Sequence, residues 1–294
     1  MKGHSAGCFG EVLIPLQRHK AHRSVNETPC VAVDYDDLSG TATSLEAANV
    51  DTVICAFGME SDAVSEAQVN LIHAADMSKS TRRFVVSGYD MLFQEAHIPI
   101  VPIAKWTLAA IHAVEKTKLE YTRVVNGLFL DYYGLPHWSS HLKPWVNAVN
   151  PAGKWAVLPG DGSAPVNFIT SQDMARFVVR LMDLPEWSPV SYIAGQTTTF
   201  QKILQLAEDA RGERFSVKYE RLEDLRKGRI SFPEFYKTGL ESTGQSSESI
   251  FALFHYLSST GGYTIVSDDT LDARFPDVKI TTAAEVIQSS WRGR

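Results

Sequence analysis

Residues 52–88 read TVICAFGMESDAVSEAQVNLIHAADMSKSTRRFVVSG, and this stretch decides the fold. Residues 52–57 are apolar or β-branched and end at Gly58, and residues 83–87 form a second such run that ends at Gly88. Between them, residues 62–76 carry apolar side chains at helical spacing. The stretch therefore predicts a strand, a helix and a second strand, each strand ending at a glycine.

The same alternation extends in both directions from this stretch. A short strand over residues 31–33 precedes it, and a helix over residues 104–116 and a strand over residues 121–125 follow it. Strands that alternate with helices imply a parallel sheet covered on both faces. We therefore predict the α/β class, with a Rossmann-like, doubly wound parallel sheet in a first domain over residues 1–135.

Beyond about residue 135 the chain breaks into short segments punctuated by Pro, Trp and Gly. We predict a smaller α+β lobe over residues 136–294, packed on the same core with some interleaved strands and helices. Its expected elements are a strand over 154–158, helices over 171 to about 184 and 200–211, a strand over 263–266 and a helix over 282–291.

Capping signals mark the two clearest helices of this lobe. Thr170 or Ser171 is the expected N-cap of the first helix. For the second helix, Thr198 and Gln201 fit a capping box and Gly212 fits a C-terminal stop.

The composition is that of an ordinary soluble globular protein, with 294 residues, 44% hydrophobic and 21% charged. A formal net charge of −6 gives no reason to expect nucleic acid as a partner. The cysteines Cys8, Cys30 and Cys55 lack metal-ligand spacing and favour a reducing, cytoplasmic compartment. No apolar run has the length of a membrane span or the character of a signal peptide, so we expect no membrane association.

Two histidine pairs have the spacing of helical metal ligands. They are His19 with His22 and His137 with His141. Neither pair is accompanied by acidic or cysteine ligands, so we predict no metal site.

The segment Gly3–Gly7 reads GHSAG and matches the G-x-S-x-G pattern of a hydrolase nucleophile elbow. An elbow needs a preceding strand that holds the serine in a strained, exposed turn. Only Met1 and Lys2 precede Gly3 here. A serine hydrolase acting through Ser5 is therefore the least favoured hypothesis.

From residue 33 onward the chain resembles the NmrA-like and isoflavone-reductase-like branch of the short-chain dehydrogenase superfamily, especially its fungal members. The order of several motifs is more specific than any one of them. They are Val33-Asp34-Tyr35 followed by Leu45, VICAFG (53–58), Gln68 in EAQVNLIHAA, RRFVVSGYD (82–90), Lys105, LEYTRVVNGLFLDYYGLP (119–136), KWAVLPGDGSAPVNFITSQDMARFV (154–178), AGQTTTFQKILQLAEDARGERFSV (194–217) and ARFPDVKITTAAEVI (273–287).

The resemblance implies an NADP-dependent oxidoreductase, a reductase that acts on a small secondary metabolite. The first domain would bind NADP(H) and the second lobe would bind the substrate, a small molecule. The family also contains cofactor-sensing regulators, so a regulator, or a non-redox member with weak cofactor binding, is the alternative. No pattern in the sequence sets an oligomeric state.

The resemblance also implies the residues of the site. Lys105 takes the place of the family's active-site lysine and would donate a proton as the substrate accepts hydride. The implied cofactor-binding residues are Gly7, Phe9, Gly10, Arg23, Ala56, Phe57, Gly58, Gln68, Ser87, Gly88 and Lys105. The implied substrate residues are Tyr89, Asn126, Phe129, Tyr132 and Trp138.

The N-terminus departs from the family pattern. The family begins with a strand that runs into a glycine-rich phosphate loop, whereas here Gly3, Gly7 and Gly10 begin the chain, the first strand is missing and the second is abbreviated. A missing central strand leaves neighbouring backbone groups unpaired, so we expect impaired NADP(H) binding. Three explanations are open: a truncated or misspliced start, a divergent family member, or a strand over residues 11–16 that fills the gap.

Overall fold

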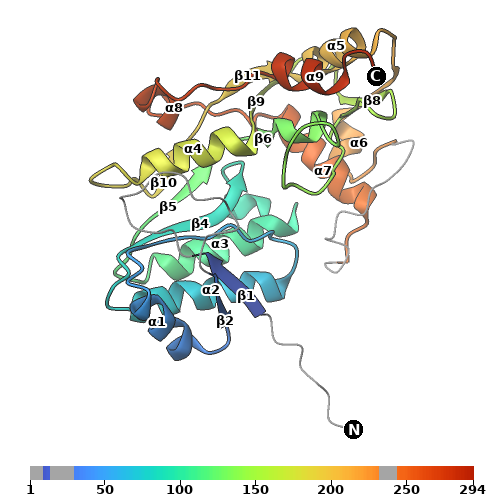
Figure 1. The fold of residues 1–294 in the computed structure, drawn as a ribbon. Helices are drawn as coiled ribbons and strands as arrows, with labels where there is room; N and C mark the ends of the chain where they lie inside the picture. The colour runs from blue at the N-terminus through green and yellow to red at the C-terminus, as the bar shows by residue number, and fades with distance from the viewer. Residues whose placement is uncertain (1–8, 14–29, 232–243) are drawn as a thin grey trace. The chain divides into compact units, whose positions relative to one another are not determined.

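The computed structural model describes residues 9–13, 30–231 and 244–294. The chain divides into two compact units, each made of separated stretches of sequence (Figure 1). Unit 1 comprises residues 1–87 and 105–123, and unit 2 comprises residues 88–104 and 124–294. The single boundary expected after residue 135 stays a prediction.

The first elements along the chain alternate between strands and helices. They are β1 (Phe9–Leu13), β2 (Cys30–Asp34), α1 (Leu38–Ala47), β3 (Thr52–Ile54), α2 (Asp62–Met77), β4 (Arg83–Asp90), η2 (Glu95–His97), α3 (Pro102–Val114) and β5 (Glu120–Val125). The main sheet has the order β10-β5-β4-β3, in which β10 is Val190–Tyr192. Strands β3 and β4 are parallel, with Thr52 opposite Arg83. The α/β class predicted from the sequence is confirmed.

Strand β1 pairs with β2 rather than with the main sheet. The two strands are antiparallel, with Gly10 opposite Val33, and form a separate two-stranded sheet. Phe9 and Gly10 therefore lie in a strand, which corrects the expectation of a glycine-rich turn at Gly10. Of the other residues implied at the phosphate loop, Gly7 and Arg23 lie outside the described residues.

The core of unit 1 depends on the pattern that the sequence shows over residues 52–88. Helix α2 begins at the N-cap Ser61, whose hydroxyl accepts a hydrogen bond from the Val64 amide. Its positions Ala67 and Leu71 are buried at helical spacing and join Phe84 of β4 in one apolar cluster. Helix α1 contacts α2, and the two lie side by side in Figure 1.

Unit 2 is built around two small sheets. Its elements are β6 (Leu128–Phe129), η3 (Leu130–Tyr133), β7 (Val149–Asn150), β8 (Trp155–Pro159), β9 (Pro165–Ile169), α4 (Ser171–Leu181), β10, β11 (Gln196–Thr199), α5 (Phe200–Arg211), β12 (Ser216–Glu220), α6 (Leu222–Arg226), α7 (Ser247–Ser259), α8 (Leu271–Arg274) and α9 (Ala283–Trp291). The sheet orders are β11-β9-β6 and β12-β8-β7. Within the core of this unit, the ring of Phe168 contacts Tyr133 and Phe200 edge to face, each at 5.9 Å between ring centres.

Most elements predicted for this lobe form, with two corrections. The segment 263–266 is not a strand, although the Tyr263 carbonyl accepts a hydrogen bond from the Asn167 amide of β9. The N-cap of α5 is Thr199 rather than Thr198, because the Thr199 side chain accepts the hydrogen bond from the Lys202 amide. Thr170 caps α4, and Gly212 ends α5 in the left-handed conformation, both as predicted.

Within the described ranges, no helix has the length and apolar character needed to cross a membrane.

Candidate functional site

The end of β4 in unit 1 is fixed by two buried side chains. The Ser87 amide donates to the Oε1 atom of Gln68 at 2.7 Å, and the Ser87 hydroxyl donates to the Phe57 carbonyl at 2.9 Å. Gln68 is fully buried, and its Nε2 atom faces the sulfur of Met59. One side chain from α2 therefore joins the end of β4 to the segment that follows β3, so Gln68 and Ser87 shape this end of the sheet.

The segment after β3 carries the other implied cofactor residues of unit 1. Ala56 and Gly58 are exposed, and Phe57 is half-buried with its ring 5.3 Å from Tyr35, edge to face. The preceding Cys55 is buried, and this burial raises the pKa of its thiol to about 12. Cys55 is therefore an inert core thiol, whereas Ala56 and Gly58 present their surface to solvent.

Lys105 lies in the first turns of α3 and contacts the N-terminus of α2. Its Nζ atom is 3.2 Å from Asp62 Oδ1, and the indole Nε1 of Trp106 donates to the same oxygen at 2.7 Å. The bonds from Trp106 and Lys105 lower the pKa of Asp62. Since Asp62 is the first residue of α2, the structure brings Lys105 close to the loop that joins β3 to α2.

In unit 2, the chain after β5 contributes Asn126 and Gly127. Asn126 is fully buried; its amide donates to the Asp90 carbonyl at 3.2 Å, and its side-chain Oδ1 has no hydrogen-bond partner among the described residues. Gly127 has a φ of +74° and packs directly on the backbone of Asn167. The backbone of the predicted substrate residue Asn126 is thus held next to the end of β4.

The predicted substrate residue Tyr132 belongs to an aromatic group in unit 2. Its ring contacts Phe129 at 6.4 Å and Trp145 at 5.3 Å, both edge to face. Trp145 in turn stacks on Phe251 of α7. Trp138, the other predicted aromatic substrate residue of this loop, contacts a different element: its Nε1 atom donates a hydrogen bond to Gln172 of α4 at 3.4 Å.

The loop that carries Tyr132 is anchored by the buried carboxylate of Asp131. Asp131 accepts hydrogen bonds from the hydroxyl groups of Ser140 and Ser171, each at 2.6 Å, and from the Ser171 amide at 2.8 Å. These bonds satisfy the carboxylate, as a buried charge requires. Asp131 therefore has a structural role and fixes the loop to the N-terminus of α4.

Asp90 is an acidic residue of this region that no sequence motif singled out. It ends β4 in unit 2, and its Oδ1 atom accepts a hydrogen bond from the Met91 amide at 2.8 Å. Burial raises the pKa of Asp90 to about 6, while the Tyr263 hydroxyl acts in the opposite direction. Its position at the carboxyl end of a parallel strand was the signal that the sequence offered.

The predicted residues thus fall into two groups, one in each unit. Unit 1 contains Phe9, Gly10, Gln68, Ser87, Lys105 and the 56–58 segment, while the remaining described ones belong to unit 2: Gly88, Tyr89, Asn126, Phe129, Tyr132 and Trp138. In the described part of the chain, no group of three or more His, Cys, Asp or Glu side chains is placed to hold a metal ion.

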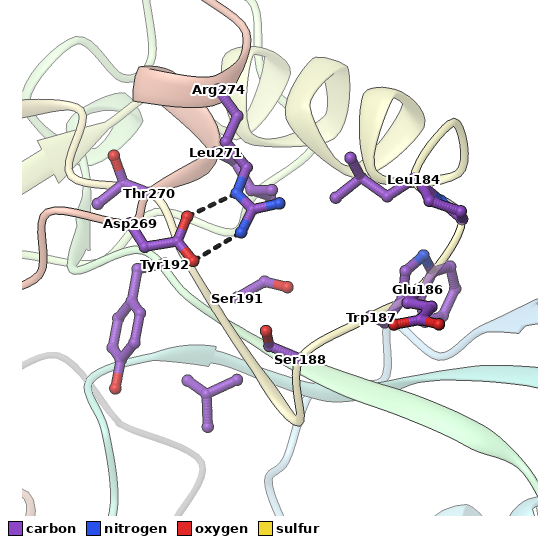
Figure 2. A pocket seen from close by; sticks show the side chains of 12 residues that line it. Leu184, Glu186, Trp187, Ser188, Ser191, Tyr192, Asp269, Thr270, Leu271 and Arg274 are labelled. Carbon is purple, nitrogen blue, oxygen red and sulfur yellow. Dashed lines mark hydrogen bonds and ion pairs between the residues drawn. The ribbon is translucent and has the colours of Figure 1, made fainter.

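A separate cavity of about 340 Å³ lies elsewhere in unit 2 (Figure 2). Arg274 closes one side of it through two hydrogen bonds to Asp269, of 2.5 and 2.6 Å. Trp187 and Tyr192 contribute aromatic rings to its lining. No substrate residue predicted from the sequence lines this cavity.

The described strands and helices define a Rossmann-like α/β protein with polar side chains at the carboxyl end of β4. The chain belongs to the NmrA-like family, whose sequence profile matches residues 26–263. The resemblance stated from the sequence is therefore confirmed.

The chain is similar to fungal proteins that are named oxidoreductases. Oxidoreductase BOA1 of Botryotinia fuckeliana (strain B05.10) is 34% identical over 190 residues, which is 65% of this chain and 63% of that protein. The match thus spans less than two thirds of that relative. Oxidoreductase swnN of Metarhizium robertsii is 27% identical over 296 residues, which covers 91% of this chain and 86% of that protein.

Solved structures share the fold at low sequence identity. AtPrR2 with NADP+ and (+)pinoresinol is 17% identical with a TM-score of 0.66, covering 87% of this chain and 80% of that chain. The leucoanthocyanidin reductase–NADPH complex from Vitis vinifera is 14% identical with a TM-score of 0.67, and the match covers 86% of this chain and 82% of that chain. Both likenesses support the Rossmann-like fold.

Gln68→Leu is expected to lower the free energy of unfolding by about 1–3 kcal/mol, because the buried Ser87 amide loses its acceptor. Urea denaturation followed by circular dichroism measures this change. Gln201→Leu, at an exposed position of α5, is the matched control and is expected to stay within about 0.5 kcal/mol of the wild type. Equal effects of the two substitutions would contradict the role given to Gln68.

Proposed function

We propose that this protein is an NADP-dependent oxidoreductase that reduces a small secondary metabolite. The observation that carries the proposal is the pair of hydrogen bonds by which Gln68 and Phe57 hold Ser87, near the carboxyl end of β4 in a parallel sheet. Ligands of open α/β sheets bind at this edge. Family membership and the names of the fungal relatives support a redox reaction.

The residues of unit 1 fit one part of a dinucleotide. Ala56 and Gly58 are exposed after β3, and neither carries a side chain larger than a methyl group. Phe57 adds a half-buried ring, and Ser87 lies near the carboxyl end of the next strand, β4. These residues would hold the cofactor, whose nicotinamide supplies a hydride when it is bound.

Lys105 is the proposed acid. Its ammonium group, held by Asp62 at the N-terminus of α2, would give one proton to the substrate atom left with excess electron density after hydride addition. The substrate would thus gain one hydride and one proton, and the lysine would be left as a neutral amine.

The substrate side of the proposal rests on unit 2. Tyr89, Asn126, Phe129, Tyr132 and Trp138 stay the predicted substrate contacts. The aromatic group around Tyr132 favours a planar or apolar small molecule, because such rings bind through contact area and edge-to-face geometry.

A cofactor-sensing regulator is the second candidate. The observation that favours it is the Lys105–Asp62 contact, since it gives the proposed acid a carboxylate partner within its own unit. A regulator would bind NADP(H) without turnover, whereas a reductase would oxidise NADPH in the presence of a substrate.

NADPH, NADP+ and NADH are to be titrated into the protein by calorimetry, with Ala56→Tyr as the test variant. We expect NADPH to bind, and the tyrosine ring at Ala56 to weaken that binding about tenfold by occupying the cofactor's place. Ala175→Tyr, at an exposed position of α4, is the control and should leave binding unchanged.

Two outcomes would decide between the candidates. Absence of NADPH binding would reject both the reductase and the cofactor-sensing regulator. NADPH oxidation is measured by absorbance at 340 nm in the presence of a panel of aromatic ketones, enones and cyclic imines. Binding of NADPH without its oxidation by any of these molecules would reject the reductase.

A further inference from the structure

The cavity shown in Figure 2, of about 340 Å³, lies between two segments of unit 2. The first segment, residues 269–274, contains α8, and the second, residues 184–192, follows α4 and ends with β10. The volume of the cavity is within the range of small-molecule pockets, about 300–1,000 Å³. Among the described residues that line it, none belongs to the proposed reductase site, so a molecule bound here would occupy a second site.

In the first segment, the guanidinium group of Arg274 is held in one orientation. Its Nε and Nη2 atoms donate to the two carboxylate oxygens of Asp269, at 2.5 and 2.6 Å. A guanidinium group has five N–H donors, so this pairing leaves both hydrogens of Nη1 to donate elsewhere. Figure 2 shows the third nitrogen of Arg274 turned away from Asp269 and toward the cavity. A carboxylate in the cavity would therefore meet a charged donor that is already oriented.

The second segment supplies a carboxylate, a hydroxyl group and an apolar surface. Glu186 is exposed, and no cation of the described ranges pairs with it. Trp187 is buried, and its Nε1 atom donates to the Leu181 carbonyl at 2.9 Å. In Figure 2, Glu186 and Trp187 lie across the cavity from Asp269, and the Ser188 hydroxyl points into the cavity. This segment therefore offers a negative charge beside an aromatic ring.

The two sides of the cavity are fixed before any ligand binds. The side chain of Asp272 in α8 accepts a hydrogen bond from the Ala194 amide at 2.8 Å, which joins α8 to the chain just after β10. The bond from Trp187 to Leu181 ties the second segment to the end of α4. Binding to such a preorganised site costs less conformational entropy than binding to mobile loops.

We propose that this cavity binds a small zwitterion, an α-amino acid with an apolar side chain. The ligand carboxylate would accept hydrogen bonds from Arg274 Nη1 and the Ser188 hydroxyl. Its ammonium group would pair with Glu186, and its side chain would pack on Trp187. Asp269 and Arg274 neutralise each other, so Glu186 leaves the charged lining residues with a net negative charge. A zwitterion meets both signs of charge, whereas a simple carboxylate meets the repulsion of Glu186.

The test uses the full-length protein without cofactor and three probes that share a phenyl ring. L-Phenylalanine is the zwitterion, 3-phenylpropionate lacks the ammonium group, and 2-phenylethylamine lacks the carboxylate. Calorimetry or ligand-observed NMR measures the affinity of each probe for the wild type, Glu186→Gln, Ser188→Ala and Arg274→Lys. Glu248→Gln, at an exposed carboxylate of unit 2 outside the cavity lining, is the matched control.

We expect the wild type to bind L-phenylalanine more tightly than either partial analogue. Glu186→Gln should weaken binding of L-phenylalanine about tenfold and strengthen binding of 3-phenylpropionate, because a charge is removed that attracts one and repels the other. Arg274→Lys and Ser188→Ala should weaken both probes that carry a carboxylate and change 2-phenylethylamine less than twofold, because each removes a donor to the carboxylate. Glu248→Gln should change none of these affinities.

Unfolding temperatures establish that the variants are folded. The proposal fails if L-phenylalanine does not bind the wild type, or if Glu186→Gln and Arg274→Lys bind it as tightly as the wild type does. Tighter binding of 3-phenylpropionate than of L-phenylalanine would also overturn it, because the cavity would then be a simple anion site. Neither NADPH nor turnover enters this experiment, so its result is independent of the proposed reductase function.

Discussion

Gly127→Ala is expected to lower the free energy of unfolding by about 3 kcal/mol or more, because two costs combine at this position. Its φ of +74° lies in the left-handed region, where a Cβ atom costs about 1–2 kcal/mol. A Cβ atom built there would also lie 2.2 Å from the Asn167 carbonyl oxygen, so the backbone must move. Thermal and urea unfolding measure the loss.

Asn167 cannot relieve this overlap easily, because its side chain is bound on both sides. Its Nδ2 atom donates to the Ala194 carbonyl and the Thr197 hydroxyl, at 2.7 and 2.9 Å, and its Oδ1 atom accepts from the Ile265 amide at 2.7 Å. Any shift of β9 at this residue stretches hydrogen bonds to two other segments. The close approach of Gly127 is therefore a fixed feature of unit 2.

Gly212→Ala is the matched control for this prediction. Gly212 ends α5 with a φ of +71°, and an added Cβ atom would meet nothing within 4 Å. Gly212→Ala is therefore expected to lower the free energy of unfolding only by the cost of the left-handed conformation, about 1 kcal/mol. Equal destabilisation by the two substitutions would contradict the steric explanation, whereas a difference of about 2 kcal/mol or more supports it.

The regular part of the fold could be predicted because local pattern and burial agree there. Over residues 52–88, apolar spacing and a serine N-cap indicate β3, α2 and β4, and all three form. The glycines do not end the strands as predicted, because β3 already ends at Ile54 and β4 continues past Gly88 to Asp90. The helix over 171–181 and the one over 200–211 likewise carry capping threonines at their first turn. An element can be predicted from the sequence where apolar spacing, capping residues and burial all favour the same structure.

Other elements depend on contacts that no local pattern contains. Helix α7 (Ser247–Ser259) is apolar around most of its circumference, since Ile250, Phe251, Leu253 and Phe254 are all buried. It therefore lacks the amphipathic period that marks a surface helix. The segment 263–266 has strand-like composition, but it joins β9 only through isolated hydrogen bonds, which sequence does not reveal.

The sequence predicted several residues of the candidate site, but it did not predict the partners of the charged side chains. Gln68, Ser87 and Lys105 belong to motifs, and the structure ties Gln68 to Ser87. The partners of the charged groups come from distant sequence: Asp62 contacts Lys105 across 43 residues, and Tyr263, which follows Asp90 far along the chain, lowers the pKa of that carboxyl. Long-range pairs of this kind need the tertiary fold.

Lys105→Met is expected to reduce turnover about 100-fold or more, because it removes the proposed proton donor while keeping the apolar length of the side chain. The measurement is NADPH oxidation with the panel molecule that the wild type reduces fastest. Folding and cofactor affinity should change little, because the Lys105 and Asp62 side chains are 63% and 80% exposed and solvent screens such a pair.

Asp62→Asn separates the proton donor from its ion pair. This variant keeps the ammonium group and an oxygen that accepts from Trp106, and removes only the negative charge. If Lys105 supplies a proton, Asp62→Asn should retain turnover within about fivefold of the wild type while Lys105→Met does not. Equal losses in the two variants would mean that Lys105 acts by tethering α3 to α2. Turnover of Lys105→Met within threefold of the wild type would remove this lysine from the reaction altogether, because general acid catalysis contributes about 100- to 10,000-fold.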